Sequence, residues 1–146
     1  MSRLWLTGAS SGIGAALAER LLAEGHSLAV TARQAAPLQA LAQRHGARVL
    51  VVPGDITDAG QVREIVRRIE QAWGALDRVV LNAGTCEYLE PGRFDAALVE
   101  RVVRTNVLGA AQCIQACLPL LRQGVRPHLV VIGSAVTWLA LPRAGA

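Results

Sequence analysis

This chain of 146 residues contains no lysine, and all 15 of its lysine or arginine positions are arginine. Every lysine-based mechanism is therefore excluded within these residues. Aromatic residues make up only 3% of the sequence, and the arginines are scattered along the chain. Because nucleic-acid binding uses clustered basic residues and stacking rings, the net charge of +4 does not indicate a nucleic-acid partner.

Cysteine is also scarce, and Cys86, Cys113 and Cys117 are too few for a disulfide scaffold. Cys113 and Cys117 are one helical turn apart and could share a metal ion. No other cysteine or histidine lies near them, so small buried side chains are the better interpretation and we expect no metal site. No apolar run approaches ~20 residues and no leader with a cleavage site is found, so we expect a cytoplasmic protein with no membrane partner.

Apolar residues make up 52% of the sequence, which is typical of strands buried on both faces of a parallel sheet. The length suits one domain with a single core. Short apolar runs alternate with amphipathic segments, which predicts an α/β, doubly wound, Rossmann-like parallel sheet in the order 3-2-1-4-5 with helices on both faces. We expect strands at 3–7, 27–32, 47–52, 76–81 and 128–132. We expect helices from about 12 to 25, at 37–45, at about 57–73 and at about 94–122.

A glycine-rich turn, Thr7-Gly8-Ala9-Ser10-Ser11-Gly12-Ile13-Gly14, joins the first strand to the first helix. A helix N-terminus offers unpaired N–H groups and the positive end of the helix dipole, which suit a dinucleotide's pyrophosphate. Glycine would let that ligand approach the backbone, and the serines add hydroxyl donors. The candidate binding residues here are Gly8, Ser10, Ser11, Gly12, Ile13 and Gly14. The alternative is a tight turn that only packs the helix on the strand.

Arg33 follows the second expected strand, where dinucleotide folds meet the adenosine ribose. An acidic residue at this place binds the 2′-hydroxyl group, whereas an arginine accommodates a 2′-phosphate. Residues 31–34 contain no acidic residue, so the sequence predicts NADP rather than NAD. A solvated surface arginine is the alternative.

The glycine spacing differs from the G-x-G-x-x-G fingerprint, and no Gly-Lys-Ser/Thr follows that would make it a P-loop. The arrangement Thr-Gly-x3-Gly-x-Gly instead resembles the first turn of the short-chain dehydrogenase/reductase family. The later motifs Asp55-Ile56, Asn82-Ala83-Gly84, Asn106 and Ser134 follow in that family's order, so the resemblance covers essentially the whole chain. It implies hydride transfer between NADP(H) and a small-molecule carbonyl or alcohol substrate. The glycine spacing disfavours a sugar-nucleotide epimerase.

The resemblance also implies roles for these residues. Asp55 would accept a hydrogen bond from the adenine amino group and Ile56 would cover the ring, although an aspartate here is also a common turn residue. Asn82, Ala83 and Gly84 would stabilise the central strand and let the backbone pass close to the cofactor. Asn106, a poor helix former in mid-helix, would disturb its helix and hold a water of the proton relay. Ser134 would donate to the substrate carbonyl oxygen, unless it bonds only to backbone.

The family's proton donor, a Tyr-x3-Lys pair about a dozen residues after the serine, has no counterpart before the chain ends at Ala146. Tyr88, the only tyrosine, has no lysine partner. We therefore expect residues 1–146 to form a single dinucleotide-binding domain, the amino-terminal portion of a full oxidoreductase. The alternative is a nucleotide-binding remnant or interaction module without turnover. We expect the full-length form to be a homo-oligomer through the helix at 94–122.

Overall fold

Five parallel strands form one sheet in the order β3-β2-β1-β4-β5, as the sequence predicts. The computed structural model describes residues 1–90 and 92–138. The strands are β1 (Arg3–Thr7), β2 (Ser27–Thr31), β3 (Val49–Val51), β4 (Arg78–Leu81) and β5 (His128–Val131). β4 begins later than expected because the Leu76 N–H donates to the Leu120 carbonyl and leaves the ladder.

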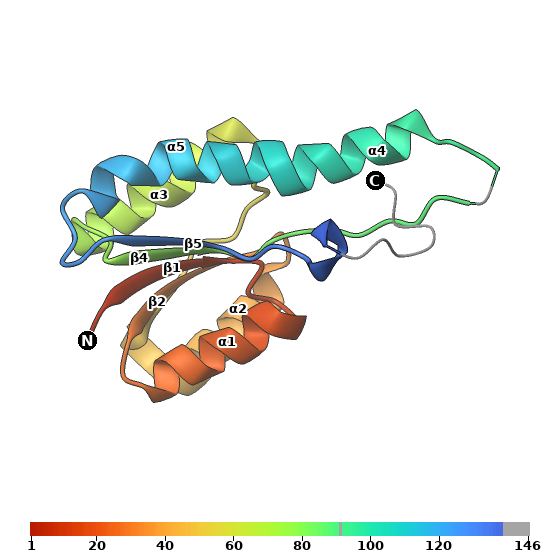
Figure 1. Ribbon diagram of the computed structural model, residues 1–146. Helices are drawn as coiled ribbons and strands as arrows, with labels where there is room; N and C mark the ends of the chain where they lie inside the picture. The colour runs from red at the N-terminus through yellow and green to blue at the C-terminus, as the bar shows by residue number, and fades with distance from the viewer. Residues whose placement is uncertain (91, 139–146) are drawn as a thin grey trace.

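Helices cover both faces of the sheet (Figure 1). They are α1 (Gly12–Ala23), α2 (Ala35–His45), α3 (Ala59–Trp73), α4 (Ala96–Val103) and α5 (Ala110–Leu121), with 3-10 turns η1 (Gly46–Arg48) and η3 (Ala135–Thr137) and a π-helical turn η2 (Arg104–Gly109). α1 and α2 lie on one face, and α3 and α5 lie on the other (Figure 1). The fold is therefore α/β and doubly wound. None of the described helices is long and apolar enough to cross a bilayer.

The two faces of the sheet bury separate apolar clusters. β1 shows the alternation, because Leu4 and Leu6 pack with the cluster under α1 and α2, and Trp5 packs with the cluster under α3 and α5. Trp5 is fully buried, and its Nε1 donates to Thr31 Oγ1 at 2.9 Å. The core thus fills both sides of the central strands.

α3 follows the predicted pattern. The Asp58 carboxylate accepts hydrogen bonds from the N–H groups of Gly60 and Gln61 at 2.7 and 3.0 Å, which caps the first turn. Gly74 ends the helix in the left-handed conformation, with φ +71°. One side of the helix is apolar and buried, and it consists of Val62, Ile65, Val66 and Ile69.

The helix expected at 94–122 is confirmed over Ala96–Leu121, and the disturbance expected at Asn106 is the π-helical η2 between α4 and α5. A π turn closes i→i+5 bonds and carries an extra residue, so it changes which side chains face the sheet. Val103 and Val107 are 40% and 57% exposed. Gly109 and Cys113 face the core in their place, and a Cβ on Gly109 would lie 2.9 Å from Ile56 Cδ1.

Two of the three cysteines are buried on α5. Burial raises the pKa of the Cys113 thiol to about 12 and that of Cys117 to about 11, so both stay protonated and pack as small apolar side chains. The described residues contain no cluster of three or more side chains that could hold a metal ion.

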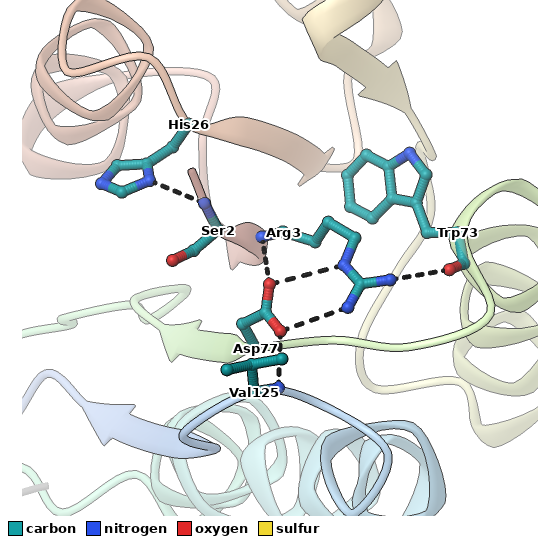
Figure 2. A network of polar contacts seen from close by, with 6 residues as sticks. All are labelled: Ser2, Arg3, His26, Trp73, Asp77 and Val125. Carbon is teal, nitrogen blue, oxygen red and sulfur yellow. Dashed lines mark hydrogen bonds and ion pairs between the residues drawn. The ribbon is translucent and has the colours of Figure 1, made fainter.

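An ion-pair network joins the amino-terminal ends of the strands (Figure 2). Asp77, 5% exposed, accepts from Arg3 N–H at 2.7 Å, from the Arg3 guanidinium at 3.3 and 3.4 Å, and from Val125 N–H at 2.8 Å. The Arg3 guanidinium also donates to the Trp73 carbonyl at 3.0 Å. Burial opposes the charge on Asp77, but these bonds outweigh it and hold the pKa of the carboxyl below its usual value. No role for Asp77 was predicted from the sequence.

Candidate functional site

A cavity of about 580 Å³ lies at the carboxyl ends of the strands. Gly8 lines it after β1, Arg33 after β2, Asp55 after β3 and Asn82 after β4. In open α/β sheets ligands bind at this edge, where the strand order reverses. The strand order reverses between β1 and β4, so the cavity lies where ligands bind in folds of this kind.

The glycine-rich turn presents unpaired amides at this edge. None of the described residues accepts a hydrogen bond from the N–H groups of Gly12 and Ile13, and the Ser11 side chain makes no capping bond. By contrast, Asp58 and Asp95 cap α3 and α4. Gly12 and Ile13 are also exposed. The start of α1 therefore keeps its donors and its positive dipole end available to an anion.

In the structure, glycine is required at positions 8 and 14 for packing within the protein, and not for the close approach of a ligand. A Cβ on Gly8 would lie 2.8 Å from Ala83 Cα, and one on Gly14 would overlap the Gly8 carbonyl and lie 2.5 Å from Asn82 Nδ2. Both glycines thus let the first turn pack on the turn after β4. Gly12 meets nothing within 4 Å, and its φ of +53° is what favours glycine there.

Thr7 and Asn82 join these two turns, and no role for Thr7 was predicted from the sequence. The hydroxyl of Thr7, a residue 1% exposed, accepts from the N–H groups of Asn82 and Ala83, both at 3.1 Å. Asn82 Nδ2 donates in return to the carbonyls of Thr7 and Gly8, both at 3.2 Å. The signal in the sequence was a hydroxyl residue at the end of an apolar strand, directly before the first glycine.

Arg33 and Asp55 line the cavity after β2 and β3. Arg33 is exposed, and it forms no ion pair or hydrogen bond with any described residue. Asp55 Oδ1 accepts from the N–H and the hydroxyl of Thr57 at 2.9 and 2.8 Å. Ile56 lines the cavity but is only 7% exposed, because it packs mainly into the core.

Two ion pairs that were not predicted from the sequence include residues of the same cavity lining. Arg101 Nη2 lies 2.7 Å from Glu87 Oε2, which ties the loop after β4 to α4. Hydrogen bonding to Arg101 lowers the pKa of Glu87. Arg104, which also lines the cavity, pairs with Glu100 at 2.8 Å. The Glu87–Arg101 pair joins residues 14 positions apart and leaves no local signal, whereas Glu100 and Arg104 are one helical turn apart.

The two expected catalytic residues lie outside the cavity lining. Asn106 is in the π-helical η2, and its side chain bonds both backbone groups of Thr85, accepting from the N–H and donating to the carbonyl at 2.8 Å each. Ser134 follows β5, and its Oγ accepts from Val136 N–H at 3.3 Å. Among the expected cofactor-binding residues, all but Gly12 and Gly14 line the cavity.

Comparison with known proteins decides the family. The short chain dehydrogenase family model matches residues 3–146, which is nearly the whole chain. The chain belongs to the short-chain dehydrogenase family. Short-chain dehydrogenases are oxidoreductases that bind NAD(P), so the cavity at the switch point is the place to look for a dinucleotide.

Individual short-chain dehydrogenases resemble the chain over most of its length. The cis-2,3-dihydrobiphenyl-2,3-diol dehydrogenase of Pseudomonas sp. (strain KKS102) is 39% identical over 136 residues, which cover 89% of this chain and 49% of that enzyme. The crystal structure of the KRED1-Pglu enzyme matches with a TM-score of 0.93 at 27% identity, over 99% of this chain and 61% of that one. The RhlG/NADP active-site complex of Pseudomonas aeruginosa matches with a TM-score of 0.91 at 29% identity, over 99% and 59%. The chain thus spans about half the length of the curated relatives it matches.

Proposed function

We propose that the chain is the cofactor-binding portion of an NADP(H)-dependent short-chain oxidoreductase, with residues 1–146 as one dinucleotide-binding domain. The observation that carries the proposal is that the uncapped start of α1 and Arg33 line the same cavity. NADP(H), when bound, exchanges a hydride with a small-molecule carbonyl or alcohol. The function of the described residues is to hold the dinucleotide and to position it.

The pyrophosphate would meet the N–H groups of Gly12 and Ile13 and the hydroxyls of Ser10 and Ser11. The two serines and Ile13 line the cavity. Anions are stabilised at a helix N-terminus because unpaired donors and the helix dipole act together. Gly8 and Gly14 support this geometry indirectly, by letting the turn sit against the end of β4.

The adenosine half would lie toward Arg33 and Asp55. A guanidinium group without a protein partner can pair with the two oxygens of a 2′-phosphate, and such charge-assisted pairs are strong. The matched RhlG structure is an NADP complex, which supports the same preference. Asp55 Oδ2 takes no hydrogen bond from a described residue and would accept from the adenine amino group, with Ile56 beneath the ring.

The substrate end rests on family resemblance. Ser134 would donate to the substrate oxygen, and Asn106 would hold a water of the proton relay from a helix that its own bonds to Thr85 keep in place. Asn82, Ala83 and Gly84 would carry the backbone past the cofactor. Exposed apolar side chains follow the same helix and favour contact between copies of a cytoplasmic homo-oligomer: Val103, Val107, Leu108 and Leu118.

Calorimetry with NADP and NAD tests the proposal. The 146-residue chain should bind NADP at least about tenfold more tightly than NAD, because a charged hydrogen-bonded pair with the 2′-phosphate is lost in NAD. Arg33→Asp should reverse that preference. The matched control is Arg63→Asp on α3, which makes the same charge change at an exposed residue outside the cavity lining.

Unchanged NADP affinity in Arg33→Asp would remove Arg33 from the site. Folded protein that binds neither nucleotide would contradict the whole proposal. The second candidate function, a nucleotide-binding module without turnover, predicts the same affinities, and it differs from the first in that no longer form of the protein would oxidise alcohols.

A further inference from the structure

The connection between β3 and α3 contains a side-chain amide that bridges two aspartates. Gln61 Oε1 accepts from the backbone N–H of Asp55 at 2.9 Å, and Gln61 Nε2 donates to Asp58 Oδ2 at 3.2 Å. The partners fix the orientation of this amide, since an N–H needs an acceptor and a carboxylate needs a donor. Gln61 therefore holds the backbone of Asp55 from the first turn of α3.

This bridge departs from the usual capping box. In a capping box the residue at the third helical position reaches back to the N–H of the N-cap. Here Asp58 is the N-cap, and its N–H is already bonded to the Asp55 carbonyl at 3.2 Å. Gln61 reaches past it to Asp55, so the helix start is coupled to a residue that lines the cavity.

The space for the bridge comes from Gly54. A Cβ on Gly54 would lie 2.9 Å from Ile65 Cδ1 and 3.3 Å from Gln61 Oε1, so a side chain there would press on the amide. Thr57 completes the arrangement by donating its N–H and its hydroxyl to Asp55 Oδ1. Asp55 is thus held at its backbone by Gln61 and at one carboxylate oxygen by Thr57.

We propose that Gln61 is a positioning residue that makes the site selective for adenine, by holding Asp55 so that its second carboxylate oxygen meets the 6-amino group. The inference rests on the proposed function, because it assumes that the adenine lies beside Asp55. Gln61 does not line the cavity, so it acts through Asp55 and does not touch the nucleotide.

The test compares NADP with its hypoxanthine analogue, in which an oxo group replaces the 6-amino group, by calorimetry on the 146-residue chain. The wild-type chain should favour NADP by at least about tenfold, since a hydrogen bond to a charged acceptor is at stake. Gln61→Met keeps the length of the side chain and removes both bonds, and it should bring the ratio of the two dissociation constants close to one. Gln71→Met, the same change at an exposed position of α3, should leave the ratio unchanged.

Two further variants distinguish the positioning of Asp55 from a general loss of nucleotide affinity. Arg33→Gln should weaken both nucleotides equally and keep the ratio. Gln61→Glu keeps the acceptor oxygen for Asp55 and loses the donor to Asp58, so it should retain part of the preference. A carboxylate also suits the first turn of a helix, so this variant decides the matter if circular dichroism shows that Gln61→Met does not fold.

An unchanged ratio in Gln61→Met, with both nucleotides weakened alike, would overturn the inference and leave Gln61 with a purely structural role. If only Gln61→Glu folds, a ratio of the two dissociation constants equal to that of the wild-type chain would also overturn the inference. Failure of the wild-type chain to bind either nucleotide would instead count against the proposed function, so the two failures are distinguishable.

Discussion

The hydroxyl of Thr7 offers a sharp test of how the site is held together. Thr7→Val keeps the branched shape but removes the one acceptor for the N–H groups of Asn82 and Ala83. Each buried N–H left without a partner costs about 1–3 kcal/mol, so the variant should lose about 2 kcal/mol or more of unfolding free energy. Thr7→Ser removes only a methyl group from a residue 1% exposed, which costs about 0.8 kcal/mol.

Urea unfolding, followed by circular dichroism, measures both variants, and calorimetry measures their NADP affinity. We expect valine to be worse than serine in both assays, because the acceptor also aligns the glycine-rich turn with the end of β4. A serine variant as unstable as the valine variant would show that packing of the methyl group dominates. That result would refute the hydrogen-bond argument.

Three other changes have definite expected outcomes. Gly14→Ala places a Cβ against backbone of its own turn, so it should cost about 1–3 kcal/mol in urea unfolding and weaken NADP binding; wild-type affinity would contradict the packing argument. Because the folded pKa of Asp77 is depressed, the stability it contributes is present above about pH 4 and is lost as the pH falls through the lower folded value. Asp77→Asn should reduce the pH dependence of the unfolding free energy in that range. A pH dependence equal to that of the wild-type chain would show that the Asp77 carboxyl is not its source. Arg101→Gln should hardly change the urea midpoint but should speed amide exchange in residues 85–90, since the exposed pair with Glu87 mainly holds that loop; unchanged exchange would remove the tie.

Local patterns were enough to predict most of the fold. β1 runs over residues 3–7 as expected, and the strand order follows from alternating strands and helices with right-handed crossovers. α3 has both a cap, Asp58, and an apolar stripe in its own sequence. The helix at 94–122 and its disturbance at Asn106 were both predicted from the sequence, and the π-helical η2 contains that residue. The contact made by Asn106 could not be predicted, because its side chain bonds the backbone of Thr85, 21 residues earlier.

The same distinction between local patterns and long-range contacts applies to the candidate site. Motif residues that follow β1, β2, β3 and β4 could be placed at the cavity from sequence, because parallel strands bring their carboxyl ends to one edge. The residues that hold those motifs in place could not be predicted from the sequence. Thr7 acts on Asn82 from 75 positions away, and Gln61 acts on Asp55 past a helix cap that already looks complete. A hydroxyl in a strand or an amide in a first turn is ordinary by itself. Its role exists only when the register of β1 against β4, or the path from β3 into α3, gives it a partner.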